Sequence, residues 1–178
     1  MPPSIWTFLF GCIALLGGLS GFIQAESRIL VGADDAQLQA WVDQATADKL
    51  QPLWVQAVTV QRQPRFCAIA DSDQKSRSWS MRHNLTPAEF QTEFERLAKD
   101  GYQLSCWTGY LRDQKDQIAA IWVKHDEGGY WHALSQMSPV QFQEKLEEMR
   151  NNRELPWQIT HYATKSPRID LRILSRSA

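Results

Sequence analysis

The sequence repeats itself with a fixed period. Trp79 and Trp131 are 52 residues apart, and each is followed seven residues later by a hydroxyl residue, Thr86 or Ser138. The same period relates two longer sets of residues, Pro87, Phe90, Gln91, Phe94, Glu95 and Leu97 in one copy and Pro139, Phe142, Gln143, Leu146, Glu147 and Met149 in the next. A weaker copy precedes them at Asp34, Leu38, Gln39, Val42, Asp43 and Ala45. Such self-similarity indicates a fold built from copies of one supersecondary unit.

Each copy contains a helix. Thr86 is a good N-cap, Pro87 suits the first helical position, and Glu89 completes a capping box with Thr86. Ser138 and Asp34 occupy the corresponding position in the other two copies. Apolar residues then recur at helical spacing, which predicts amphipathic helices. Gly101 is expected to end the middle helix.

Two strand-like runs follow each helix, and a short polar loop joins them. These runs cover residues 53–61 and 65–71, then 102–111 and 117–124, then 157–162 and 168–174. Such pairs are typical of β-hairpins. Residues 118–123 are apolar on both faces, which predicts a central strand, whereas the alternation of Arg168, Asp170 and Arg172 with apolar residues favours an edge strand.

These patterns predict an α+β fold of three helix–strand–strand repeats, each about 52 residues long and all sharing one core. The expected repeats cover residues 34–85, 86–137 and 138–178 of a repeat domain that spans 26–178. Each repeat closes on a Trp, and residues 26–33 form a leader into the first helix. One such unit cannot cover its own apolar face, so neighbouring units must do so.

The first 25 residues differ from the rest of the chain. They contain no Asp, Glu, Lys or Arg, and residues 5–23 are an apolar run interrupted by glycines. We interpret residues 1–25 as a secretory signal peptide, although no basic residue precedes the run. The alternative is an uncleaved membrane anchor; lipidation at Cys12 is a weaker alternative. The expected location is secreted or periplasmic, with membrane attachment only through this segment.

Cleavage would leave two cysteines, Cys67 and Cys106. An exported protein can form a disulfide, but the sequence does not place the two residues within bonding distance. Cys67 corresponds to Ala119 in the next copy, which favours a small buried residue. Two buried thiols are therefore favoured over a disulfide, and the disulfide stays open.

The stretch from Trp79 to Trp122 resembles a known repeat. It contains Arg82-His83 before Leu85-Thr86, then Gly101-Tyr102, Gly109-Tyr110 and Ala119-Ala120-Ile121-Trp122. This pattern resembles the bacterial tandem repeat domain that also forms the N-terminal region of polyglycine hydrolases. The resemblance implies an accessory role, because in that family a separate serine-hydrolase domain carries the chemistry. Asn84 departs from the pattern, which has Gly at this position.

Aromatic residues that the repeat does not require are the better candidates for a ligand surface. Trp41, Trp54 and Trp157 are not shared between copies, whereas Trp79 and Trp131 are. His83 and His132 lie close to matching positions, so we add them to the candidate ligand-binding residues. Core packing is the competing interpretation for each of these aromatic residues.

No motif identifies a reaction. Cys106 with a histidine could act as nucleophile and base, and His125 with His132 could bind zinc, but neither arrangement has a recognised spacing. We therefore expect no catalytic residues, no metal and no cofactor. A net charge of −1 gives no indication of a nucleic-acid partner.

We therefore expect a non-catalytic, secreted or envelope-associated module that binds a protein or glycan. The alternatives are a hydrolase-related or Cys/His-dependent enzyme and a purely structural envelope component.

Overall fold

The computed structural model describes residues 27–72, 77–124, 131–152, 154–162 and 168–174. The described chain passes three times through the order strand–helix–strand–strand. The first unit contains β1 (Ser27–Ala33), α1 (Asp35–Ala47), β2 (Leu50–Val60) and β3 (Gln63–Ser72). The second contains β4 (Trp79–Leu85), α2 (Pro87–Lys99), β5 (Tyr102–Arg112) and β6 (Lys115–Lys124). The third contains β7 (Trp131–Met137), α3 (Pro139–Asn151), β8 (Leu155–Tyr162) and β9 (Arg168–Leu174).

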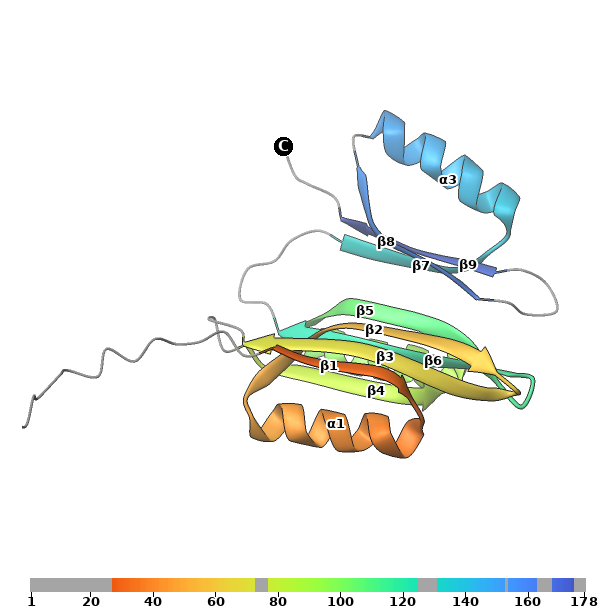
Figure 1. Ribbon diagram of the computed structural model, residues 1–178. Helices are drawn as coiled ribbons and strands as arrows, with labels where there is room; N and C mark the ends of the chain where they lie inside the picture. Colours follow the sequence, from red (N-terminus) through yellow and green to blue (C-terminus); the bar gives the residue numbers. More distant parts are fainter. Residues whose placement is uncertain (1–26, 73–76, 125–130, 153, 163–167, 175–178) are drawn as a thin grey trace, which may run out of the picture.

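Each unit forms its own three-stranded antiparallel sheet, with the last strand in the centre (Figure 1). The strand orders are β1-β3-β2, β4-β6-β5 and β7-β9-β8. The central position predicted for residues 118–123 is confirmed by β6. The edge position predicted for the last strand is wrong, since β9 pairs with both β7 and β8. One wet face does not require an edge, because a central antiparallel strand can also face water on one side.

The strand before each helix corrects the predicted unit. Residues 27–33 form a strand, not a leader, and β4 pairs with β6 of the sheet that follows it in the chain. Trp79 and Trp131 therefore open a unit; they do not close the preceding one. The sheets cover residues 27–72, 79–124 and 131–174, so the predicted repeat ranges assigned β4 and β7 to the wrong unit. A strand belongs to the sheet with which it pairs, and the pairing partner lies about 40 residues further along the chain.

The helices begin where the caps predict. Asp34, Thr86 and Ser138 each accept a hydrogen bond from the residue three positions later, and all three starts are capping boxes. Gly101 follows the end of α2 with φ of +82°, the left-handed conformation expected of a terminating glycine.

A bulge interrupts the first strand of each sheet just before the helix. Gly32 lies there in the first unit with φ of +67°, and Asn84 occupies the corresponding position in the second with φ of +58°. Asn tolerates this conformation better than most residues, which explains how it can replace the expected Gly. The Tyr110 hydroxyl holds the position: it accepts a hydrogen bond from Asn84 N at 2.8 Å and donates one to Asn84 Oδ1 at 2.9 Å.

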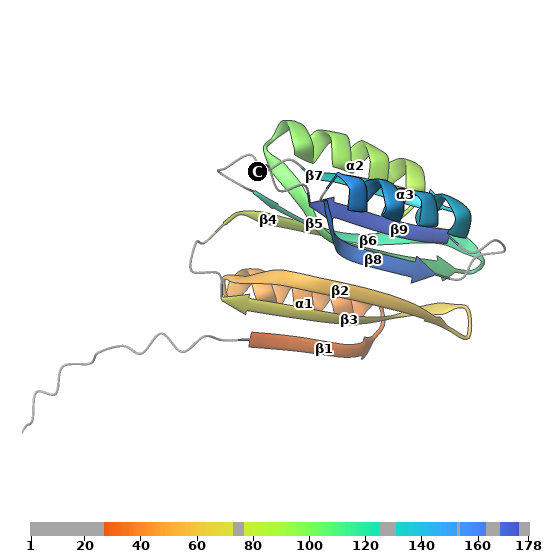
Figure 2. The same cartoon turned by 90° about the horizontal axis from the view of Figure 1, so that it is seen from above.

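Neighbouring units meet along their β2 and β5 strands, which lie side by side at matching repeat positions. The Thr59 hydroxyl donates to Leu111 O at 2.8 Å and accepts from Leu111 N at 3.0 Å. At the hairpin ends, Asp113 N donates to Arg62 O at 3.1 Å. β5 in turn contacts β8 of the third unit. The strand β5 therefore contacts one strand of each of the other two units (Figure 2).

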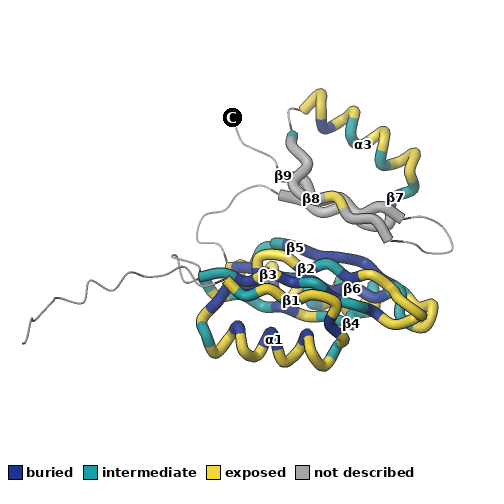
Figure 3. The backbone as a smooth tube through the Cα atoms, in the orientation of Figure 1, coloured by how far each residue is buried: buried dark blue, intermediate teal, exposed yellow. Residues whose placement is uncertain are grey.

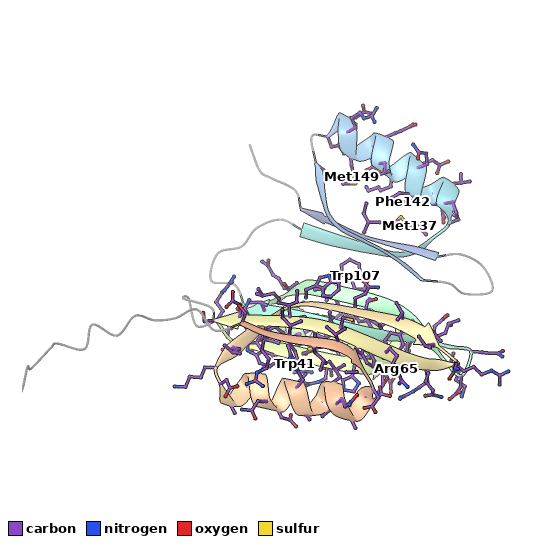
Figure 4. All side chains as sticks on the ribbon, in the orientation of Figure 1. Trp41, Arg65, Trp107, Met137, Phe142 and Met149 are labelled. Carbon is purple, nitrogen blue, oxygen red and sulfur yellow. The ribbon has the colours of Figure 1, made fainter. Side chains whose placement is uncertain are left out.

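The expected single core is instead three clusters in the described residues. The largest joins α1 and the first sheet to one face of the second sheet, including Met81, Tyr110 and Ile121. The second lies between α2 and the other face of the second sheet, around Trp107 and Trp122. The third lies between α3 and its sheet, where Met137, Phe142 and Met149 converge (Figure 4).

The interpretation of residues 1–25 as a signal peptide or anchor lies outside the described residues. In the part of the chain that is described, no helix has the length and apolar character needed to cross a bilayer.

We predict that Tyr110→Phe lowers the free energy of unfolding by about 1–3 kcal/mol, because it leaves the half-buried polar groups of Asn84 without the Tyr110 hydroxyl. Denaturant unfolding followed by circular dichroism measures this. Tyr102→Phe, on a half-buried ring of the same strand, is the control and should change stability by less than about 0.5 kcal/mol. Equal losses in the two variants would show that the hydroxyl does not hold the bulge.

Candidate functional site

A groove separates helix α1 from strand β4. It has a volume of about 730 Å³ and lies where the first unit meets the second. One wall comes from α1 and the other from the start of the second sheet, and its lining residues are Gln39, Val42, Asp43, Thr46, Arg77, Ser78, Trp79, Ser80, Met81, Arg82 and His83. It therefore contains one of the predicted ligand-binding residues, His83.

His83 lies at the end of this groove among groups of the first unit. Its Nε2 is 3.3 Å from Gln39 Oε1 and its Nδ1 is 3.7 Å from Asp35 Oδ1. Its ring meets Phe66 edge to face, with centroids 5.9 Å apart. Asp35 also pairs with Arg112 of β5. The histidine thus joins β4 to α1, and its ring is held by contacts on several sides.

Burial lowers the pKa of His83 from its ordinary value of 6.5, and a hydrogen bond with the Asn84 side chain opposes this only in part. The neutral imidazole is therefore favoured near neutral pH, where one ring nitrogen donates and the other accepts. The contacts with Gln39, Asp35 and Phe66 explain His83 as a residue that joins the two units.

Cys106 does not resemble an activated nucleophile. Its side chain is 3% exposed, and its Sγ lies 3.5 Å from Val55 N and 3.6 Å from Val55 O. Reactive cysteines are partly exposed in electropositive surroundings, whereas this thiol packs against the backbone of the neighbouring unit. Cys67 is half-buried, and the two cysteines of the described ranges form no disulfide.

The predicted aromatic residues do not form one surface. Trp41 is 6% exposed and lies between α1 and the strands (Figure 4), so its assignment to a ligand surface is wrong. It follows Leu38 by three residues and shares the buried stripe of the helix. Trp54 is 38% exposed on the first sheet. Trp157 lies in β8 and His132 in β7, but their side chains lie outside the described residues.

The face of the first sheet that carries Trp54 has several exposed apolar residues, which lie beside polar ones such as Gln56 and Arg65. One row of paired residues crosses all three strands as Ile29, Ile69 and Trp54, and they are 66%, 37% and 38% exposed. Val31 and Val58 extend the surface and are 77% and 54% exposed. We call these five residues the outer face of the first sheet. Exposed residues of β1, β2 and β3 are coloured yellow in Figure 3.

The corresponding row of the second sheet is fully covered. It consists of Met81, Ile121 and Cys106, and none of them is more than 4% exposed. The first unit covers this row, since all three residues belong to the cluster that contains α1. The outer face of the first sheet is thus an interface of the repeat whose covering unit is missing from the described residues. Contiguous exposed apolar residues often mark interaction sites.

Sequence reasoning missed this face, although a signal for it was present. Comparison at the 52-residue spacing aligns Ile29 with Met81 and Ile69 with Ile121, so the chain keeps apolar residues at positions that a neighbouring unit buries. The comparison required β1 to be recognised as a strand.

The zinc alternative rested partly on His125, which lies outside the described residues. Within the described ranges, no group of three or more His, Cys, Asp or Glu side chains could hold a metal ion.

We predict that the same substitution has unequal effects at matching positions of the two sheets. Ile121→Ala should lower the free energy of unfolding by about 2–5 kcal/mol because it opens a cavity in a closed core. Ile69→Ala should cost less than about 1 kcal/mol because this side chain already contacts water. Denaturant unfolding at low protein concentration compares them, and equal costs would mean that the outer face is covered within the single chain.

A second prediction concerns pH. The pKa of His83 is lower in the folded protein than in the unfolded chain. As pH falls through 6.5, the folded state therefore binds fewer protons than the unfolded state does. Stability should therefore decrease over this window and level off below the folded pKa. Thermal unfolding between about pH 7.5 and about pH 5.5 should show a smaller decrease for His83→Gln than for the unsubstituted chain; an unchanged decrease would exclude His83 as its source.

Comparison with known proteins identifies the repeat. The family described as "Polyglycine hydrolase-like, structural repeat" matches twice, at residues 26–71 and 76–125. The matched ranges begin just before β1 and β4, so each includes the leading strand of its unit. A search of the curated proteins found no match. The two matches cover more than half of the chain, and the protein therefore belongs to the polyglycine hydrolase-like structural repeat family.

Proposed function

We propose that this protein is a non-catalytic, secreted or envelope-associated module that binds a protein partner through the outer face of its first sheet. We include the third unit as a further copy of the same repeat, because its element order and strand order repeat those of the two matched units. The observation that carries the proposal is the contrast between the exposed row on the first sheet and the buried row on the second.

The chemistry of this face favours a protein over a glycan. Its five defining residues are aliphatic apart from Trp54, and sugars require polar groups that bind their hydroxyls. The matching face of the second sheet shows what such a surface accepts, namely an amphipathic helix together with a strand edge. The partner should therefore present a helix with apolar residues at helical spacing.

The catalytic alternative has less support. Cys106 is buried against the backbone of Val55, and His83 lies among contacts between units. An accessory role also agrees with a family whose description names a structural repeat. The uncharged apolar segment at residues 1–25 supports export, with an uncleaved anchor as the alternative for this segment.

We predict that a partner captured from native envelope extract depends on the outer face. The full chain carrying a C-terminal tag should capture a protein identifiable by mass spectrometry. The Ile29→Glu variant should not capture it, because burying the new carboxylate under the partner would cost a large desolvation free energy.

Val140→Glu is the matched control. It places the same charge at another exposed apolar residue, on α3 and away from the first sheet, and it should retain the partner. If the outer-face variant captures the same proteins as the unsubstituted chain, the face is not the binding surface.

A further inference from the structure

The third unit presents the side with which the first unit covers its neighbour. In the first unit, Val55 of β2 is 0% exposed and its N–H lies 3.5 Å from Cys106 Sγ of the next unit. Ile159 occupies the matching position of β8 and is 51% exposed. On α1, Val42 is 8% exposed, whereas its counterpart Leu146 on α3 is half-buried. We call the surface formed by Leu146 of α3 and Ile159 of β8 the α3–β8 surface.

This surface and the outer face of the first sheet are two halves of one type of contact. Where the first unit covers the second, α1 and β2 supply one half, and the strands β4, β5 and β6 supply the other. The α3–β8 surface corresponds to the first half and the outer face to the second. Within the described ranges, each half is left without the other.

The residues at the two ends also differ from the internal contact in a matched way. Inside the chain, Asp35 of α1 pairs with Arg112 and lies 3.7 Å from His83. The position of Asp35 is occupied by Pro139 in the third unit. The positions of Arg112 and His83 are occupied in the first unit by Val60 and Val31, which are 48% and 77% exposed.

The pairing of Asp35 with Arg112 and its contact with His83 are thus replaced by apolar residues on both sides. Had only one side changed, a buried charge would be left without its partner, which is strongly unfavourable. Because both sides are apolar, the α3–β8 surface suits the outer face of the first sheet.

We propose that the partner of the outer face is a second copy of this chain, which docks through its α3–β8 surface; this rests on the proposed function. The contact is head to tail, so a pair of copies keeps one free outer face and one free α3–β8 surface. Repetition of such a heterologous contact produces an open series or a closed ring. The chain would then extend its internal stacking of units across chain boundaries.

The test is a complementation experiment on the full chain, measured by analytical ultracentrifugation from micromolar to millimolar concentration. The unsubstituted chain should form species of two and more copies as concentration rises. Ile29→Glu blocks the outer face and Ile159→Glu blocks the α3–β8 surface, and each alone should remain a single chain. An equimolar mixture should form a species of two chains and no larger one, because each variant retains the surface that the other lacks.

Val140→Glu is again the control: its counterpart on α1, Ala36, stays exposed at the internal contact between units, so this variant should assemble like the unsubstituted chain. Circular dichroism and thermal unfolding confirm that each variant is folded; if Ile29→Glu is not, Val58→Glu replaces it on the same face.

Three results would overturn the proposal. A single chain at all concentrations excludes self-association. Dimers of Ile159→Glu alone indicate contact between two outer faces. Assembly that persists in both variants comes from another part of the chain. None of these results affects the proposed function, because capture of a different protein that Ile29→Glu loses would still show the outer face as a binding surface.

Discussion

The contact between a strand edge and a sheet face is the interaction on which the rest of this structure depends. β2 is an edge strand, and two of its outward amides meet side chains of β5: Val55 N lies 3.5 Å from Cys106 Sγ, and Ala57 N lies 3.5 Å from Thr108 Oγ1. The same contact between units packs apolar residues of α1 and the first sheet against one face of the second sheet. Edge amides and apolar surface are thereby removed from water together, which satisfies the polar groups that burial would otherwise leave unpaired.

Because this contact has two unlike sides, a row of repeats has two unlike ends. In the second sheet, both faces are covered: one by the first unit and the other by α2. Within the described ranges, the first sheet is covered only on its α1 side, and exposed apolar residues remain on its other face. The proposed binding surface therefore follows from the place of the first unit at one end of the row of repeats. A search for motifs of catalytic or metal-binding residues does not detect such a surface.

Local signals predicted much of this fold. The caps at Asp34, Thr86 and Ser138 fixed the helix starts, and the hairpin runs fell within the strands that follow. The strand before each helix was not recognised, because Arg82, His83 and Asn84 interrupt its apolar pattern and its partner is distant in the chain. The same omission hid the candidate surface. Trp41 was misassigned because it was judged by its absence from the other copies, although it lies on the apolar stripe of its helix. The groove beside His83 forms only where two units meet.

At the edge of β2, amides contact side chains of β5, where a further strand of the same sheet would contribute backbone carbonyls. This arrangement has one further consequence. Open strand edges are templates for uncontrolled pairing, and proteins usually blunt them with charge, proline or a covering element. Here Cys106 and Thr108 occupy the edge with groups that accept from specific amides. Pairing at this edge is thereby restricted to sequences that carry the right side chains at the right positions, and an arbitrary β-strand gains little by approaching it.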